Sequence, residues 1–369
     1  MFVQPRLRVG APGSGVEIAP DEAHIRLVEG CLVAGAAGDM IGGPYETWSA
    51  ARMRAEQVRP VISDRSRIGD DTQLMLFTLE GVIRARVRGW SKGICWPPGV
   101  IWHAYLRWGI TQGIEPPADR KELVESGWLY SHEVLYDRCR PSPRCLAAVR
   151  EDVRGTVEEP PNAAVGSGAI MRIAPVGLLF DGGSVVEYAA QTAALTHGGA
   201  KAIAATSAYA ALLNQLVEGV EFRSALERAV TMCRALPAAE VLRPALAKAI
   251  DLARRSPRSA AAMHQLGTGQ TSLGALLHAV YATLCTDTTE QAVAVAIHQD
   301  GSSATSGALA GQVSALVHGP EKVPSAWRAQ LPVTGLITEM VNDWPRIAEA
   351  NWYVHDELAD ELWEKYPGY

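Results

Sequence analysis

The chain has 369 residues, of which 48% are hydrophobic and 20% are charged, a composition typical of a soluble globular protein with a substantial core. Its 34 Lys and Arg residues against 40 Asp and Glu residues give a net charge of −6 without any basic stripe, so a nucleic-acid partner is not expected. The six cysteines contain no CxxC pair, which favours reduced thiols in a cytoplasmic protein and disfavours a zinc site or a disulfide framework.

The first segment, residues 1–20, mixes Arg, Gly and Pro with isolated apolar residues. We expect it to form a flexible arm, because it lacks the continuous apolar run of a signal peptide. Residues 21–369 are expected to form a single domain. The most apolar later segment, Ala202 to Val217, is interrupted by four polar residues, so no membrane span and no membrane partner are expected.

Helical periodicity dominates the chain and strand signals are weak, which predicts an all-α fold. Breaks fall at turns rich in glycine and proline, such as Trp96 to Gly99. Arg138 to Val165 contains four prolines and is predicted to be a long irregular surface segment. The predicted helices cover His24 to about Gly38, Asp70 to about Val87, Glu187 to Leu216 with an interruption at Leu195 to Gly199, Arg223 to Arg234, Glu240 to Arg255, and Leu273 to Leu284.

Two adjacent carboxylates, Asp70 and Asp71, stand at the start of an apolar helical run that continues from Gln73. One interpretation is that they cap free amide groups and complement the positive end of the helix dipole. The other is a site for a hard metal ion, because two like charges repel unless a cation or a proton lies between them. The pair alone does not decide between the two.

A loop of small residues, Gly166-Ser167-Gly168, precedes another apolar run. Its backbone amides could hold a phosphate, although a plain tight turn would show the same pattern. His197 lies beside two glycines in a break between helical segments, where a hydrogen-bonded structural histidine is the simpler interpretation.

A second carboxylate, Asp300, stands in a turn rich in hydroxyl residues that leads into a helix of small residues containing Gly307 and Gly311. This arrangement repeats that of Asp70, with a carboxylate ahead of an apolar helix. The sequence therefore predicts carboxylates at the N-termini of two helices, which we call the helix mouths.

Five motifs together resemble the ADP-ribosylglycohydrolases, a family that includes dinitrogenase reductase-activating glycohydrolase and the ADP-ribosylarginine hydrolases. The similarity extends over roughly Gly30 to Gly319. The motifs are weak singly and specific together, and they follow the order of the family: Gly30 to Glu46, Gly69 to Thr72, Gly166 to Pro175, Thr196-His197, and Asp300 ahead of Gly307 to Gly311. The resemblance implies a compact all-α bundle with a central cleft that holds Mg²⁺ or Mn²⁺.

The resemblance also implies roles for the carboxylates. Asp70 and Asp71 would be metal ligands from the first helix mouth, and Asp300 would be a ligand from the second. Glu46 and Asp71 would be catalytic, with Glu46 acting on the water or the substrate. Cleavage of an N-glycosidic bond passes through an oxocarbenium-like state and needs a carboxylate to manage the incoming water. Asp39 is expected to be structural.

The substrate implied by the resemblance is ADP-ribose joined to an acceptor, such as the arginine of a protein. The loop of small residues would hold the diphosphate, and a histidine would border the distal ribose. The implied substrate-binding residues are Gly166, Ser167, Gly168, Ala169, Met171, Arg172 and His197.

Two positions depart from the family pattern. Gly69 stands where the family carries Thr or Ser before the acidic pair, which removes one hydroxyl ligand. The second metal motif, normally Asp-x-Asp-Ser/Thr, aligns with His298 to Gly301, so His298 replaces one Asp and Gly301 replaces the hydroxyl residue. A shifted register would instead place Ser302, Ser303 or Thr305 near the metal. Fewer or weaker metal ions are expected, one or two at most, because imidazole suits softer metals than Mg²⁺.

Three functions remain open from the sequence. The first is a metal-dependent hydrolase that removes ADP-ribose from arginine or another nitrogen acceptor on a protein. The second is a hydrolase of a small ribosylated molecule. The third is a non-catalytic relative that binds ADP-ribose, another nucleotide or a partner protein.

Overall fold

The computed structural model describes residues 22–354 and 356–369, so the arm predicted at residues 1–20 lies outside the described residues. Over the described ranges the chain forms eighteen α-helices and six short 3₁₀ helices with no strand, and a single isolated antiparallel bridge joins Gly166 to Thr271. The prediction of an all-α fold is confirmed. Among the described helices, none combines the length and the apolar character that a membrane span requires.

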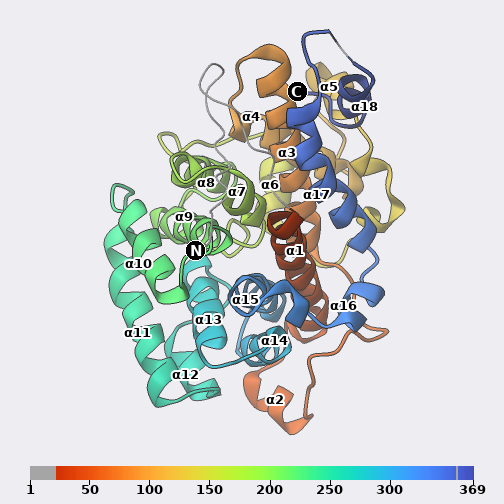
Figure 1. Ribbon diagram of the computed structural model, residues 1–369. Coiled ribbons are helices and arrows are strands. Elements are labelled where there is room, and N and C mark those ends of the chain that lie inside the picture. The colour runs from red at the N-terminus through yellow and green to blue at the C-terminus, as the bar shows by residue number, and fades with distance from the viewer. Residues whose placement is uncertain (1–21, 355) are drawn as a thin grey trace.

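Helices dominate both halves of the chain (Figure 1). Those of the first half are α1 Glu22–Gly42, α2 Ala50–Ala55, α3 Asp70–Lys92, α4 Pro97–Thr111, α5 Lys121–Val124, α6 Pro143–Glu151, α7 Ala174–Leu179 and α8 Val185–Ala194. Those of the second half are α9 Ala200–Val217, α10 Phe222–Met232, α11 Leu242–Arg255, α12 Ala260–Gln265, α13 Ser272–Leu284, α14 Thr289–Ile297, α15 Ser303–His318, α16 Ser325–Gln330, α17 Thr334–Glu349 and α18 Glu357–Lys365.

The centre of the molecule is a close pair of helices, α1 and α15, which the other helices surround (Figure 1). Glycines line the contact between them, and their lack of side chains brings backbone against backbone. A Cβ atom on Gly38 would lie 2.1 Å from the carbonyl oxygen of Gly307, and one on Gly42 would lie 2.2 Å from that of Ser303. We call this contact the glycine seam; its members are Gly35, Gly38 and Gly42 of α1 with Gly307 and Gly311 of α15. It fixes the end of α1 against the beginning of α15.

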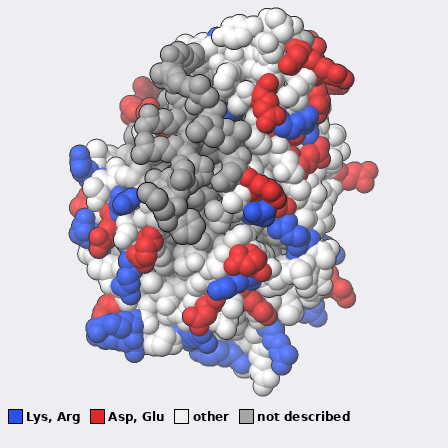
Figure 2. Space-filling model, in the orientation of Figure 1, with Lys and Arg blue, Asp and Glu red and all other residues white. Residues whose placement is uncertain are grey.

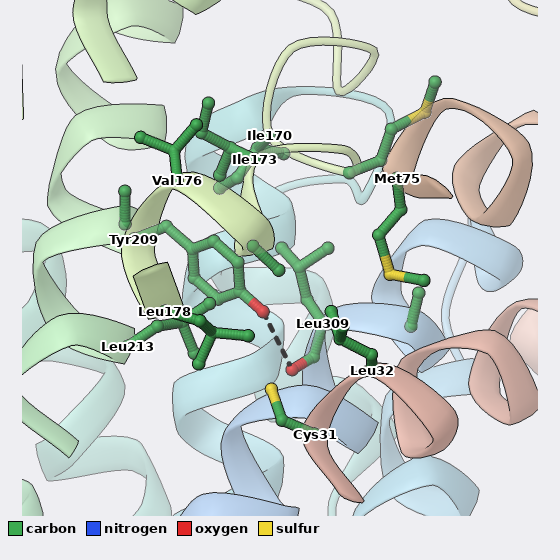
Figure 3. Packing of buried hydrophobic residues seen from close by; sticks show 14 of the residues in the cluster. Cys31, Leu32, Met75, Ile170, Ile173, Val176, Leu178, Tyr209, Leu213 and Leu309 are labelled. Atoms are coloured by element: carbon green, nitrogen blue, oxygen red, sulfur yellow. Dashed lines mark hydrogen bonds between the residues drawn. The ribbon is translucent and has the colours of Figure 1, made fainter. Parts of the chain in front are cut away.

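The hydrophobic core surrounds the central pair and joins it to α3, α7 and α9. Figure 3 shows Cys31 and Leu32 of α1, Met75 of α3 and Tyr209 of α9 converging on Leu309 of α15. The Tyr209 hydroxyl donates to Oε1 of Gln312 at 2.6 Å and also lies 3.4 Å from the carbonyl oxygen of Leu309, so this buried polar group has a partner. The core therefore holds both helix mouths on one packed unit.

A buried ion cluster fixes α3 against α4. Glu80 accepts from Arg84 within α3, with Nη2 at 2.9 Å, and from Arg107 of α4, with Nε at 2.8 Å. All three side chains are fully buried. Removing one member of such a buried ion cluster is costly, because the charge of the remaining partner is then buried without compensation or solvation. The pairing sets the position of α3, whose first turn carries the acidic pair.

The segment from Arg138 to Val165, predicted to be irregular throughout, contains helix α6. Ser142 is its N-cap and accepts from the amide of Cys145, while Pro143 occupies the first helical position. Proline is favourable there, since its fixed φ suits a helix and its missing N–H would have no partner. The prediction was wrong over these nine residues because it took Pro143 as a helix breaker.

The surface carries charges of both signs. Figure 2 shows Lys and Arg side chains interspersed with Asp and Glu over the visible face. The helices α10, α11 and α12 lie at the periphery on the side of α9 and α13, away from α3 and α4 (Figure 1). The functional residues must therefore be sought near the central pair.

Candidate functional site

A cavity of about 450 Å³ lies where three parts of the chain meet: the mouth of α3, the mouth of α15 and the loop of small residues. Four carboxylates, two arginines and a histidine are among the side chains that line it. Its lining residues include Asp39, Glu46, Gly69, Asp70, Asp71, Cys139, Arg140, Ser142, Arg144, Gly166, Ser167, Gly168, Met171, His197, Gln270, Ser302, Ala304 and Thr305. The structure thus brings together most of the residues that the sequence singled out.

Asp39, near the end of α1, caps the first turn of α3. Its Oδ2 accepts from the backbone amides of Gly69 at 2.7 Å and Thr72 at 3.2 Å, and from the Thr72 hydroxyl. A Cβ atom on Gly69 would lie 2.6 Å from Asp39 Oδ1. The glycine that departs from the family pattern is therefore the residue that lets Asp39 approach, and Asp39 has the structural role expected of it while also lining the cavity.

Asp70 and Asp71 occupy the first turn of α3 and are both mostly buried. Asp70 Oδ2 accepts from the backbone amide of Ser142 at 2.7 Å, which ties α3 to the start of α6. Asp71 lines the cavity together with Thr305 of α15. Asp71 Oδ1 is buried and has no hydrogen-bond partner among the described residues, which is unusual for a carboxylate oxygen.

Burial raises the pKa of every carboxyl group in this cluster. It raises the pKa of Asp39 to about 6 and that of Asp70 to about 7, and it raises the pKa of Asp71 well above its usual range. Repulsion among the neighbouring carboxylates acts in the same direction. The pKa of Glu46 is raised by burial as well. A group of this kind is neutralised by protons or by a cation.

We expect the stability of the cation-free wild type, relative to the Asp70→Asn variant, to fall as the pH rises from about 4 to about 7. In this range the folded state holds a proton on Asp70 and the unfolded chain does not, so unfolding releases a proton. The free energy of unfolding therefore decreases as the pH rises. The decrease approaches about 1.4 kcal/mol per pH unit for one proton. Urea unfolding in EDTA at pH 5, 6, 7 and 8 measures both free energies.

Asp70→Asn is the reference protein because buried histidines make the free energy of unfolding rise with pH, which is opposite to the effect of Asp70. His278, for example, has a pKa lowered by burial to about 4, and both proteins share this contribution. A free-energy difference that stays constant over these pH values would show that Asp70 is ionised in the folded protein.

Glu46 follows the short 3₁₀ helix η1, Gly43–Tyr45, and closes the start of α15. Its Oε1 accepts from the amide of Ala304 at 2.7 Å and from the hydroxyl of Ser302 at 3.0 Å. A carboxylate at this position complements the positive end of a helix. These contacts use one carboxylate oxygen of Glu46, which lines the cavity beside Asp39 and the acidic pair.

Asp300, predicted to be a metal ligand, lies outside the cavity. Its Oδ1 accepts from the backbone amide of Ala50 at 2.8 Å, and its Oδ2 lies 3.7 Å from His264 Nδ1, with the side chain 54% exposed. The chain turns at Gly301, where φ is +140°, so Asp300 points towards α2 while Ser302 points inward. The alignment of the second motif on Asp300 was therefore wrong.

The shifted register places hydroxyl residues in the cavity instead. Ser302, Ala304 and Thr305 line it, whereas the Ser303 hydroxyl donates to the carbonyl oxygen of Ile297. If Thr305 is the hydroxyl residue of the pattern Asp-x-Asp-Ser/Thr, the two aspartates of the pattern fall three residues and one residue before it. Ser302 and Ala304 occupy these positions. Both carboxylates of the second metal motif are therefore absent from this chain.

The loop of small residues forms another part of the cavity wall. Gly166, Ser167, Gly168 and Met171 line the cavity as predicted for a binding loop. The amide of Ser167 is already engaged by the carbonyl oxygen of Gln270 at 2.9 Å. No described residue accepts from the amide of Gly168, which lines the cavity, so this donor remains for an anion.

Two residues predicted to bind substrate do not reach the cavity. Ala169 is fully buried in a small apolar cluster. Arg172 is also fully buried, and its guanidinium group lies over the ring of Tyr105 at 4.4 Å. The loop turns inward after Gly168 and continues into the core, so these two residues lie beyond the part of the loop that lines the cavity.

His197 does line the cavity, as predicted, and a Cβ atom on Gly168 would lie 2.8 Å from its Cε1. Burial lowers the pKa of His197 to about 3, and the positive charges of Arg172 and Arg144 lower it further in the same direction. The imidazole is therefore neutral at physiological pH.

Sequence reasoning missed the residues that the 138–144 segment contributes. Arg140 donates to the carbonyl oxygen of Gly43, Ser142 holds Asp70, and Arg144 lines the cavity. The pair Ser142-Pro143 is the signature of a helix start and could have revealed α6. Nothing local indicated that α6 begins opposite α3.

The donors at the mouth of α3 suit a hard cation in kind. Over the described part of the chain, no three His, Cys, Asp or Glu side chains form a group that could hold a metal ion. The available oxygens are those of Asp70, Asp71 and the Thr305 hydroxyl, which are the type that Mg²⁺ or Mn²⁺ prefers. The unpartnered Oδ1 of Asp71 fits one such ion completed by water or ligand oxygens. A second ion does not fit, because Ser302 and Ala304 replace carboxylates.

The helical fold is shared with proteins of known structure. Forty-seven chains of solved structures are similar, and one, an ADP-ribosylglycohydrolase-related protein complex, matches with a TM-score of 0.60 and 21% identity. That match covers 89% of this chain and 100% of the other. No curated protein sequence matches this chain. The model of the ADP-ribosylglycohydrolase family matches residues 20–366, and the chain belongs to this family.

Proposed function

We propose that this protein hydrolyses the N-glycosidic bond between ADP-ribose and an acceptor such as the arginine of a protein. Membership of the family implies a glycosidase that acts on ADP-ribosyl compounds. The observation that carries the finer proposal is the convergence of Glu46, Asp71 and the Gly166–Gly168 loop on one cavity. A carboxylate cluster and a glycine-rich loop in one cavity suit a ligand whose ribose and diphosphate lie side by side.

In this proposal Glu46 manages the attacking water. Its Oε1 is held by α15 through Ala304 and Ser302, which fixes the carboxyl group while Oε2 remains for the cavity. A carboxylate held in this way can accept a proton from water as the bond to the acceptor breaks. Positioning by two hydrogen bonds favours a reactive geometry, since little freedom is lost when substrate arrives.

We propose a single Mg²⁺ or Mn²⁺ ion as cofactor, held by Asp70, Asp71 and the hydroxyl of Thr305. When bound, such an ion orients ribose hydroxyl groups and lowers the pKa of a coordinated water. Asp70 is oriented for this role by the amide of Ser142. Asp71 would find in the cation the partner that its buried Oδ1 lacks.

The diphosphate is proposed to lie on the loop of small residues. The free amide of Gly168, which lines the cavity, can donate to a phosphate oxygen without any metal. Arg144, which is exposed at the cavity rim, would add a positive charge near the phosphates.

A second candidate is a non-catalytic relative that binds ADP-ribose, and the loss of both carboxylates at Ser302 and Ala304 favours it. Hydrolysis of a small ribosylated molecule is the third. The assay is release of ADP-ribose from ADP-ribosylated arginine in a protein and from the free ADP-ribosylated amino acid, with Mg²⁺, with Mn²⁺ and in EDTA. We expect release with a divalent cation. Binding of ADP-ribose without any release would support the second candidate.

The variant Gly168→Val is expected to weaken ADP-ribose binding by at least about tenfold. Its Cβ atom would lie 2.8 Å from His197 Cε1 and 3.0 Å from the hydroxyl oxygen of Ser142, so the side chain must displace the histidine or enter the cavity. Isothermal titration calorimetry measures the affinity. Gly89→Ala is the matched control, because no atom lies within 4 Å of the added Cβ. Unchanged affinity in Gly168→Val would place the ligand elsewhere.

A further inference from the structure

A buried chain of hydrogen bonds leads from Arg172 to the cavity. The Arg172 Nη2 donates to the hydroxyl oxygen of Thr196 at 2.8 Å, and this oxygen lies 2.7 Å from His197 Nδ1. Arg172 and Thr196 are fully buried, and His197 is almost so. The chain joins a residue in the core to one that lines the cavity.

Contacts to both terminal nitrogens and to one face hold the guanidinium group in place. Nη2 also donates to the carbonyl oxygen of Thr192 at 3.2 Å, Nη1 contacts the sulfur of Cys145 at 3.1 Å, and the plane lies over Tyr105. A guanidinium group has donors only and stays charged. The bond to Thr196 therefore has one direction, with the threonine oxygen as acceptor.

The direction of the next bond follows from the donors that remain. The Thr196 oxygen receives the Arg172 hydrogen, and its own hydrogen is free to donate. The nearby acceptors are the Nδ1 lone pair of His197 and the thiol of Cys145, and sulfur is the weaker acceptor. The hydroxyl therefore donates to Nδ1, and the single proton of the neutral imidazole resides on Nε2.

The Nε2 atom faces the loop of small residues. A Cβ atom on Gly166 would lie 3.5 Å from it, and one on Gly168 would lie 3.0 Å from it. Nε2 has no hydrogen-bond partner among the described residues. An N–H group at this point is a donor aimed at whatever ligand lies on the loop.

We propose that Arg172 and Thr196 are positioning residues that hold His197 in its Nε2–H tautomer, so that the cavity presents a fixed donor to an acceptor oxygen beside the Gly166–Gly168 loop. The ligand atom must then be an oxygen with a free lone pair, such as that of a phosphate or a ribose hydroxyl, and an N–H group is rejected there. A rejected donor would leave two buried hydrogens facing each other without an acceptor. The nature of the ligand rests on the proposed function, whereas the tautomer does not.

The tautomer is measured directly by two-bond ¹H–¹⁵N correlation spectra of ¹⁵N-histidine-labelled protein, with His197→Gln used to assign the signals. We expect the wild type to carry its proton on Nε2. Thr196→Ser keeps the hydroxyl and should keep this tautomer, whereas Thr196→Val should populate the Nδ1–H form. Thr192→Val is the matched control: its hydroxyl is buried in the preceding turn without a partner, so its removal should leave the histidine signals unchanged.

Binding of ADP-ribose by calorimetry gives the second readout. We expect Thr196→Val to weaken it about tenfold, with Thr196→Ser and Thr192→Val close to wild type. A proton on Nδ1 in the wild type would overturn the inference, and so would an Nε2–H tautomer that persists in Thr196→Val. If the wild type shows the expected tautomer and its loss in Thr196→Val but binds no ADP-ribose, the positioning role stands and the proposed function fails.

Discussion

Asp71→Asn is expected to lower kcat/KM for ADP-ribosylated arginine by at least about 100-fold and, in the same protein, to raise stability without cations at pH 8. Both effects come from one charge. The carboxylate is buried beside Asp39, Asp70 and Glu46, and its Oδ1 has no partner. Asparagine has the same shape without the charge, so it removes the repulsion together with the proposed cation ligand.

The gain in stability is expected to be about 1–3 kcal/mol, because like-charge repulsion is relieved and each pKa unit of such repulsion is worth about 1.4 kcal/mol. Urea unfolding in EDTA measures it. Addition of Mg²⁺ should stabilise the wild type, as any ligand specific to the folded state does, and should have little effect on the variant. Asp119→Asn is the control, because the Asp119 side chain is 79% exposed. Full turnover by Asp71→Asn would remove this residue from the catalytic proposal.

Gly38→Val is expected to destabilise the protein by at least about 3 kcal/mol, at the upper end of the range for overpacked cores. The added Cβ atom would lie 2.1 Å from the carbonyl oxygen of Gly307 and 2.8 Å from the amide nitrogen of Ala308. These are backbone atoms of α15, so no change of rotamer relieves the clash and the two helices must separate. Chemical denaturation followed by tryptophan fluorescence gives the loss.

The matched control is Gly89→Ala, also within a helix. Open space surrounds the added Cβ atom, and alanine favours the helix, so a gain of about 0.5–1 kcal/mol is expected. Equal stability of Gly38→Val and the wild type would mean that α1 and α15 can move apart freely. Glu46 and Thr305 could not then be held in register by their helices.

The sequence predicted features that depend on local chemistry. The helix that begins at Asp70 was recognised because its apolar period starts directly after the acidic pair, and it extends to Lys92, past the predicted Val87, until Gly93 adopts φ +73°. The break at Leu195 to Gly199 was also correct, since α8 ends at Ala194 and α9 begins at Ala200. The family resemblance is confirmed.

Features set by distant parts of the chain were not predictable from local pattern. Asp300 looked equivalent to Asp70, but a single turn at Gly301 directs its side chain towards Ala50. Arg172 stood in a motif expected to bind substrate, yet Thr192 and Thr196 hold it inside the core. In both cases the side chain's direction depends on partners that the motif does not contain.

The glycine seam makes some positions of the two central helices less tolerant of substitution than others. At Gly38, Gly42, Gly307 and Gly311 an added Cβ atom would lie 2.1–2.6 Å from a backbone oxygen of the other helix, so a larger residue there must push the two helices apart and change the spacing of the helix mouths. Ser302 and Ala304 line the cavity and are not members of the seam. Substitution at these two positions can therefore change the ligand chemistry of the cavity while the seam keeps the two helices at their present spacing.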